Sequence, residues 1–325
     1  MARLLGHTLG TPHHSLMEAL DLFAQAGLDG AEIIWQNDYR AAIPEDDDGS
    51  VVAAVIERAH SHGLTIGCLT PYTTELNNLD ADTRERDVRR LKSCIQTARV
   101  LDCPRIRVYG GSLLDHDHPE EVAQKWSYMV QSLRELGSYA ADHGTVLCIE
   151  NHFGTMSMSA ADTVRLVTDV GSAGVGILYD QANLTFTHSE GPDEAIALQA
   201  PWIRHVHVKD LEFIDEHKQL RTAAVSNIAK DERVHRSRMI GDGILDWEAI
   251  VGRLVAAGYD GSYSLEYEYR WNPEDLPDPA IGIPESARRL RQVLARASGA
   301  GTAAARPESL PVIEGIAAAS PHQRT

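Results

Sequence analysis

The sequence is short of positive charge. Its 30 Lys and Arg residues stand against 47 Asp and Glu residues, which gives a formal net charge of −17. Proteins that bind a phosphate backbone rely on clustered Lys and Arg, so we expect no nucleic-acid partner. The chain also lacks a hydrophobic run that approaches the roughly 18 residues of a membrane span. Its first residues, MARLLGHTLGTPHH, contain no long apolar segment. We therefore expect no membrane association and a cytoplasmic protein.

Cysteine is scarce, and its spacing forms no motif. The four cysteines, Cys68, Cys94, Cys103 and Cys148, stand in apolar or helical contexts, and none belongs to a CxxC pair. This pattern favours buried free thiols in a reducing compartment over a disulfide framework or a zinc cage.

Strand-like and helix-like segments alternate along most of the chain. In the first helix, Leu16, Leu20 and Phe23 recur at helical spacing, between a plausible N-cap at Ser15 and a stop at Gly27. Alternation of this kind predicts a parallel sheet. Eight strand-like runs can be assigned, at residues 4–10, 31–35, 64–72, 105–111, 145–152, 175–184, 204–210 and 262–269.

An open, doubly wound sheet would fit the alternation too. The number of units, and the polar residues after nearly every strand, favour a closed barrel. We therefore predict an α/β protein with a single (β/α)8 TIM barrel as its catalytic domain, residues 1–298, followed by a C-terminal tail, residues 299–325.

Three stretches exceed what a minimal barrel needs. Residues 211–245 form a long polar connection after the seventh strand, which is typical of a lid or substrate wall. A Pro-rich excursion, residues 271–284, follows the eighth strand. The tail contains an apolar island, LPVIEGI, for which docking and disorder are equally plausible. We predict that the excursion and the tail contact another subunit. A homo-oligomer is the first expectation and a small partner subunit the second.

Four residues with metal-binding side chains end the last four of the eight predicted strands. They are Glu150, Asp180, His207 and Glu266. The C-terminal ends of parallel barrel strands meet at one mouth, where these oxygen and nitrogen ligands would suit a divalent ion. A single Glu at a strand end is more often solvated or salt-bridged. Four such groups on consecutive strands favour a metal site.

The surrounding motifs resemble those of a known superfamily. CIENH, ILYDQANL, RHVHVKD and GDGILDWEAIVGRLVAAGYDGSYSLEYE are similar to the xylose isomerase-like sugar phosphate isomerase/epimerase superfamily, over residues 1 to about 297. The resemblance implies that Glu150, Asp180, His207 and Glu266 bind one divalent ion, with Mn²⁺ first and Mg²⁺ or Co²⁺ as alternatives. His205 lies on the same strand as His207 and is expected deeper in the barrel.

The resemblance also implies a chemistry. The ion would act as a Lewis acid on the carbonyl of a hydroxy-ketone, and a carboxylate would remove the α proton. Ketose epimerases of the superfamily use the two Glu ligands as acid and base, which assigns those catalytic roles to Glu150 and Glu266. His152, two residues past Glu150, faces the same mouth and is a rival base, since imidazole titrates near neutral pH. A hydrogen-bonded wall residue is an equally good interpretation of His152.

Further side chains are candidates for substrate contact. Lys209 follows His207 by two residues, so both side chains should face the same side of the strand. A structural ion pair would explain a lysine at this position equally well. The aromatic candidates need no function if they are core residues, and Arg238 in the long connection is more simply a surface residue. The substrate-binding candidates are Asn183, Lys209, Glu268, Tyr109, Trp35 and His7, with Tyr72 as a further aromatic.

The resulting functional hypothesis is a metal-dependent sugar isomerase or epimerase that acts on a small-molecule keto-sugar. Lyase chemistry on a 3-oxo-glycoside, as in C-glycoside deglycosidase catalytic subunits, is the close alternative and is based on His152 and the extra loops. An inosose-type dehydratase is third. An endonuclease IV-like nuclease is disfavoured, because it needs more His ligands and a basic face. A non-catalytic sugar-binding barrel is disfavoured by the intact ligand set.

Overall fold

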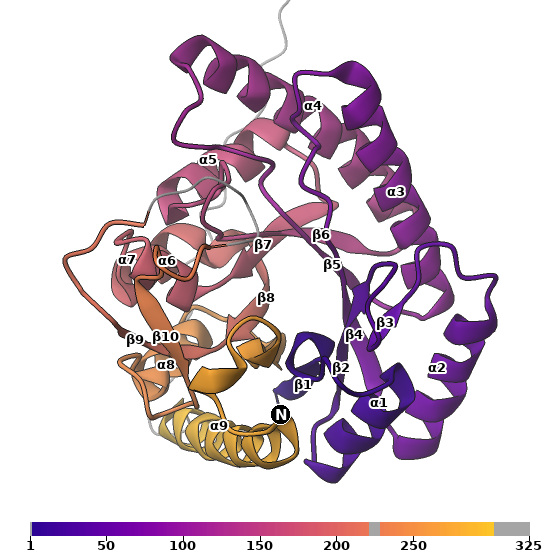
Figure 1. Cartoon of the computed structure of the whole chain (residues 1–325), viewed down its shortest axis with the longest axis vertical. Helices are drawn as coiled ribbons and strands as arrows, with labels where there is room; N and C mark the ends of the chain where they lie inside the picture. The colour runs from indigo at the N-terminus through magenta and orange to yellow at the C-terminus, as the bar shows by residue number, and fades with distance from the viewer. Residues whose placement is uncertain (1, 221–227, 302–325) are drawn as a thin grey trace, which may run out of the picture.

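A closed barrel of parallel strands forms the centre of the molecule. The computed structural model describes residues 2–220 and 228–301. Strand β1 pairs with β2 on one side and with β11 on the other, which closes the sheet (Figure 1). The order around the barrel is β1-β11-β8-β7-β6-β5-β4-β2. The fold class predicted from the sequence is therefore confirmed. The barrel strands are β1 (Arg3–His7), β2 (Gly30–Trp35), β4 (Thr65–Pro71), β5 (Arg105–Val108), β6 (Val146–Glu150), β7 (Val175–Tyr179), β8 (Ile203–Val208) and β11 (Ser262–Leu265).

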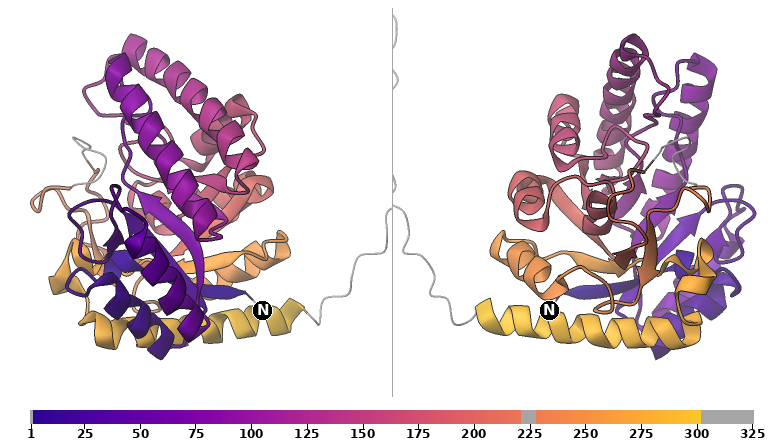
Figure 2. Two further views of the ribbon diagram at one scale, coloured as in Figure 1. Left: turned by 90° about the vertical axis from the view of Figure 1, so that its right-hand side faces the viewer. Right: turned by 60° about the vertical axis from the view of Figure 1, so that its left-hand side comes forward.

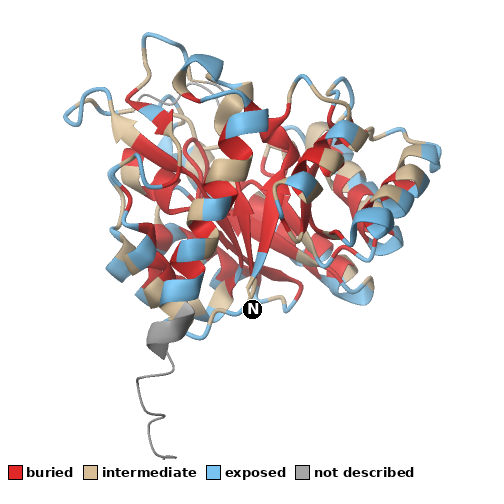
Figure 3. Cartoon of the chain, turned by 90° about the horizontal axis from the view of Figure 1, so that it is seen from below, coloured by how far each residue is buried: buried red, intermediate tan, exposed pale blue. Residues whose placement is uncertain are grey.

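Helices surround the barrel, and their outer faces carry most of the exposed residues (Figure 3). Ser15 caps the first helix as expected, since its hydroxyl accepts a hydrogen bond from the Glu18 amide while the Glu18 carboxylate accepts one from the Ser15 amide. The surrounding helices are α1 (Leu16–Gln25), α2 (Ser50–His62), α3 (Ala81–Val100), α4 (Pro119–Asp142), α5 (Ala160–Val170), α7 (Pro192–Gln199), α8 (Trp247–Ala256) and α9 (Pro279–Gly301), and a short α6 (Gln181–Phe186) follows β7. Among the described helices, none is both long and apolar enough to cross a membrane.

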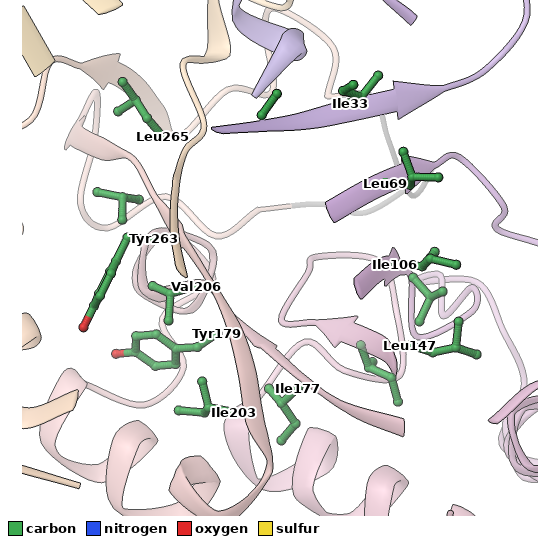
Figure 4. Packing of buried hydrophobic residues seen from close by; sticks show 14 of the residues in the cluster. Ile33, Leu69, Ile106, Leu147, Ile177, Tyr179, Ile203, Val206, Tyr263 and Leu265 are labelled. Atoms are coloured by element: carbon green, nitrogen blue, oxygen red, sulfur yellow. The ribbon is translucent and has the colours of Figure 1, made fainter. Parts of the chain in front are cut away.

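The two faces of the barrel strands carry different side chains. Ile33, Leu69 and Ile106 belong to the hydrophobic core between strands and helices (Figure 4). Glu32 and Arg107, each one position away, make their polar contacts with residues of other strands. Because neighbouring strand residues point to opposite faces, an apolar outer face leaves the interior free for charged groups. The interior is therefore where a polar site can be built.

The long connection after the seventh barrel strand is more ordered than its sequence predicts. β9 (Asp210–Phe213) and β10 (His235–Arg238) pair as an antiparallel ribbon, and residues 221–227 of the connection lie outside the described residues. Asp210 anchors the ribbon, because its carboxylate accepts hydrogen bonds from the amides of Gly241, Gly243 and Leu245. A Cβ at Gly243 would lie 2.1 Å from Asp210 Oδ1, so the second glycine of the GDG motif permits this approach.

The Pro-rich excursion is shorter than expected. Two single-turn 3-10 segments, Glu268–Arg270 and Pro273–Asp275, lead into α9. That helix begins at Pro279 and includes Pro284, so it takes in the last residues of the predicted excursion, residues 271–284. α9 packs beside α1 and α8 (Figure 2). The tail from residue 302, with its LPVIEGI segment, lies outside the described residues, so a domain division at residue 298 stays a prediction.

Candidate active site

Four acidic and imidazole side chains meet at the C-terminal end of the barrel. Glu150 ends β6, Asp180 follows β7, His207 lies in β8 and Glu266 follows β11. His207 Nδ1 lies 3.2 Å from Glu150 Oε1, 3.3 Å from Glu266 Oε2 and 3.8 Å from Asp180 Oδ2. One ligand atom from each residue falls within 4.8 Å of all the others. The residues that the sequence proposed as metal ligands are therefore adjacent in space.

Local structure fixes which oxygen of Asp180 faces this group. Asp180 is the N-cap of α6, and its Oδ1 accepts a hydrogen bond of 2.9 Å from the Asn183 amide. Oδ2 is buried without a hydrogen-bond partner and lies 3.0 Å from Lys209 Nζ. The cap therefore holds one oxygen in the helix and directs the other toward His207.

Two cations lie against the carboxylates. Arg107 in β5 donates from Nε to Glu150 Oε2 at 2.6 Å. Lys209 Nζ lies 2.8 Å from Glu266 Oε2 and 3.4 Å from Glu268 Oε1. Burial alone would lower the pKa of Lys209, but the nearby carboxylates, Asp180 foremost, raise it well above its usual value. Lys209 is therefore an ammonium ion inside the mouth.

The carboxylates respond differently to this environment. Burial opposes ionisation of Glu150, but the Arg107 guanidinium lowers the Glu150 pKa to about 2. Burial likewise opposes ionisation of Glu266, and Lys209 with His207 holds the Glu266 pKa well below its usual value. The pKa of Asp180 is raised, because burial outweighs the attraction of Lys209. A divalent cation would supply the positive charge that Asp180 lacks, so the donor set fits a hard or borderline ion.

Glu32, in β2, is a member of the site that the sequence analysis missed. Its fully buried carboxylate receives hydrogen bonds from Thr70 Oγ1 at 2.6 Å, His205 Nε2 at 2.8 Å and His207 Nε2 at 3.1 Å. Burial of an unpaired carboxylate is costly, so a Glu inside the apolar run AEIIW was itself a signal of a polar interior. His205 precedes His207 by two residues on β8 and contacts the other carboxylate oxygen of Glu32, Oε2. It therefore lies deeper in the barrel, as expected from the sequence.

His152 lies at the wall of the mouth. Its Nδ1 is 2.8 Å from the carbonyl oxygen of Phe153, which can only accept, so Nδ1 carries the proton and the Nε2 lone pair is free. Burial lowers the pKa of His152 to about 4, so the ring is neutral near pH 7. An edge contact with the Tyr109 ring, at 4.8 Å between centroids, helps to fix its orientation.

A cavity of about 110 Å³ opens above these residues. Asn183, Lys209, Glu268 and Tyr109, four of the proposed substrate contacts, line it together with His152 and Glu266. Several other lining residues were not predicted from the sequence, because they come from loops, from α6, from β10 or from the interior face of β5. These are Arg107, Phe153, Phe186, Ile228, Arg233, His235, Trp271 and Asn272.

Three other candidates lie elsewhere. Trp35 belongs to the core between strands and helices, because Glu32 points inward and odd-numbered neighbours on β2 then point outward. His7 is buried beneath the mouth with Nε2 3.6 Å from Glu32, and its Nδ1 accepts from the Leu9 amide. Neither residue lines the cavity, and substrate contact by Trp35 and His7 stays a prediction. Arg238 pairs with Glu212. Among the described residues of the connection, Arg233 and His235 line the cavity.

Comparison with known proteins gives matches over most of the barrel. A family model described as "Xylose isomerase-like TIM barrel" matches residues 20–293. The inosose dehydratase of Geobacillus thermodenitrificans (strain NG80-2) is 28% identical over 192 residues, which cover 56% of this chain and 57% of that protein. The inosose dehydratase of Bacillus thuringiensis (strain Al Hakam) is 26% identical over 187 residues, with the same coverage. The matched segments thus span little more than half of each relative.

Solved structures share the fold at lower sequence identity. An L-ribulose 3-epimerase aligns with a TM-score of 0.73 and 19% identity, covering 95% of this chain and all of its own (100%). A xylose isomerase-like TIM barrel protein from Mycobacterium smegmatis, in complex with magnesium, aligns with a TM-score of 0.70 and 17% identity, covering 91% of this chain and 98% of that one. At these identities the likeness is one of fold.

Proposed function

Because the chain belongs to the xylose isomerase-like TIM barrel family, we propose that it is a divalent-metal-dependent enzyme that removes a proton α to the carbonyl of a keto-sugar. Isomerisation or epimerisation of the sugar is the first candidate reaction. The observation that carries the proposal is the meeting of Glu150, Asp180, His207 and Glu266 within 4.8 Å at the mouth of the barrel.

These four side chains would hold one ion. Mn²⁺ is the first choice and Mg²⁺ or Co²⁺ the alternatives, since carboxylates with one imidazole suit ions of this kind. When bound, the ion supplies Lewis acidity toward the substrate carbonyl. Tyr72, Tyr109 and Trp271 line the cavity and offer apolar faces to a sugar ring or its substituent.

Proton transfer would fall to Glu266, which lines the cavity, and to Glu150, which is buried beside Arg107. The Lys209 ammonium holds Glu266 ionised. Together they form the proposed acid and base pair. His152 is the competing base, because its neutral ring keeps a free lone pair on Nε2. The Lys209 ammonium would stabilise negative charge on a substrate oxygen as the proton leaves.

Elimination is the second candidate. Loss of a β substituent requires a base for the α proton and an acid for the leaving oxygen, and His152 and Lys209 both line the same cavity. Relatives named inosose dehydratase and a neighbour titled 3-keto-D-glucoside 4-epimerase support inososes and 3-oxo-glycosides as substrates. Dehydration of an inosose and cleavage of a 3-oxo-glycoside, as by a deglycosidase catalytic subunit, are both reactions of this type.

A substrate panel separates these outcomes. Ketoses, an inosose and 3-oxo-glucosides would be incubated with the protein and Mn²⁺ in D₂O. Deuterium at the α carbon of an isomerised ketose supports the first candidate, and loss of water or of an aglycone supports the second. If every compound keeps its α proton with Mn²⁺, Mg²⁺ and Co²⁺ alike, the proposal fails.

A further inference from the structure

Glu32 and His207 form a contact beneath the proposed metal ligands. Glu32 Oε1 lies 3.1 Å from His207 Nε2, while His207 Nδ1 faces Glu150, Glu266 and Asp180. Both side chains are fully buried. The two ring nitrogens of His207 therefore have separate tasks, one toward the barrel interior and one toward the mouth.

The chemistry of this contact selects a tautomer. An ionised carboxylate only accepts hydrogen bonds, so Nε2 of His207 carries a proton when it contacts Glu32. In the neutral ring the lone pair is then on Nδ1, which is the atom that faces the mouth. The opposite tautomer would place an N–H where a metal ligand is needed and a lone pair against the carboxylate.

The position of Glu32 is itself fixed by its neighbours. Oε1 also accepts from Thr70 Oγ1 at 2.6 Å, and Oε2 lies 2.8 Å from His205 Nε2. Within residues 2–220 and 228–301, the ion-pair contacts of Glu32 are to His7, His205 and His207, with no Lys or Arg among them. Because its neighbours are imidazoles and not a permanent cation, the Glu32 carboxylate is better suited to orient a histidine ring than to neutralise a Lys or Arg side chain.

We propose that Glu32 is a positioning residue that holds His207 in the Nε2–H tautomer, with Nδ1 directed at the metal. Carboxylates that hydrogen-bond to a ligating histidine commonly contribute roughly 10- to 100-fold to metal affinity. This inference rests on the proposed function, because it assumes that the four-residue group binds an ion. It adds a fifth residue, from β2, to a group whose other four members lie on or after β6, β7, β8 and β11.

The first test measures affinity. Mn²⁺ would be titrated calorimetrically into the wild type, Glu32→Ala and Glu32→Gln. Cys68→Ala serves as the matched control, since Cys68 pairs in register with Glu32 on β4, is equally buried, and is grouped with Glu32 and His205 but not with the four proposed ligands. We expect Glu32→Ala to weaken binding roughly 10- to 100-fold. Glu32→Gln should lose less, because its amide oxygen can still accept from Nε2. Cys68→Ala should bind like the wild type.

The second test needs no substitution at Glu32. In ¹⁵N-histidine NMR of the Mg²⁺-loaded wild type, with His207 assigned from a His207→Gln sample, the proton should be on Nε2. A proton on Nδ1 overturns the inference, as does Glu32→Ala binding Mn²⁺ within twofold of the wild type, or an equal loss of affinity in Cys68→Ala. A wild type that binds neither ion refutes the proposed function instead, so the two failures are distinguishable.

Discussion

Lys209 and Glu266 form an ion pair at the mouth of the barrel, with 2.8 Å between Nζ and Oε2 and both side chains largely buried. Lys209 also lies 3.0 Å from Asp180 Oδ2, so its ammonium stands among the proposed metal ligands. A divalent ion and this ammonium repel each other at short range. We therefore expect Lys209 to balance the carboxylates when no ion is bound and to weaken the affinity for a metal ion.

Lys209→Met should tighten Mn²⁺ binding and slow turnover. We expect the Kd to fall by roughly tenfold, which is about 1.4 kcal/mol. The turnover number should fall as well, since the group proposed to stabilise negative charge is lost. Calorimetry and steady-state kinetics measure the two effects. Lys125→Met, which breaks the Lys125–Asp117 pair elsewhere, is the control. Unchanged or weaker Mn²⁺ binding in Lys209→Met would show that the Lys209 ammonium does not oppose binding of the metal ion.

Acid should destabilise the fold in part through His235. Burial lowers the pKa of His235 to about 4, from an ordinary value of 6.5. The unfolded chain takes up this proton below pH 6.5 but the folded chain only near pH 4. Stability is thus present above pH 6.5 and is lost as the pH falls toward 4. At pH 4.5 the loss assigned to this residue is about 2 kcal/mol.

His235→Phe tests that assignment. Its ring can keep the stack on Phe186, where the His235 ring lies 4.2 Å away. Urea unfolding at pH 7, 5.5 and 4.5 should show a shallower decline in unfolding free energy for His235→Phe than for the wild type. His217→Phe, at a highly exposed position, should follow the wild type. Parallel declines in all three proteins would show that His235 does not carry the effect.

Assembly can be tested at the end of α9. We predict that the Pro-rich excursion and the tail pack against another subunit, with a homodimer as the first expectation. Light scattering would compare the full chain with one that ends at Gly301, where α9 ends. The full chain should be oligomeric and the shortened chain should dissociate. A monomeric full chain, or an oligomer that survives truncation, removes the tail from the interface.

The positions of the proposed ligands were readable from sequence because each ends a strand. Parallel strands bring their C-terminal ends together whatever the loops do, so Glu150, Asp180 and Glu266 required only strand assignment. The choice of His207 over His205, on the same strand, came from the motif that resembles the superfamily. Glu32 was not readable in this way. Its partner His205 is 173 residues away, and only closure of the barrel brings them together. The Glu inside AEIIW indicates a polar interior but does not name the residues that it contacts.

Loop geometry accounts for most of the other differences. The β9–β10 ribbon consists of short strands, one of which, HRSR, carries no apolar residue, so it lacks the alternation that predicts a strand. Trp35 is the last residue of its strand, and the proposed ligands also lie at the ends of theirs. Because Glu32 points into the barrel and strand side chains alternate, Trp35 points outward to the core beneath the helices. The position of a residue along its strand predicts how near it lies to the C-terminal mouth of the barrel. The side that a residue faces depends on register, which the sequence did not fix.

His152→Ala distinguishes the candidate bases. If His152 removes the proton, α-proton exchange with D₂O should fall by roughly 100-fold or more, while Mn²⁺ affinity is retained, because His152 is outside the four-residue group. If Glu150 or Glu266 is the base, exchange should continue near the wild-type rate. His152→Phe, which keeps a ring beside Tyr109, controls for packing. Loss of metal from His152→Ala would mean that the substitution disturbs the ligands.

Calorimetric titration of Mn²⁺ into the wild type and Asp180→Ala tests the central claim most directly, with Glu268→Gln as a control inside the same mouth. Asp180 contributes one oxygen to α6 and directs the other at the site. We predict one Mn²⁺ site in the wild type and in Glu268→Gln. Asp180→Ala should show no measurable binding and no activity, with an unchanged circular dichroism spectrum. Full Mn²⁺ binding and activity in Asp180→Ala would contradict the account.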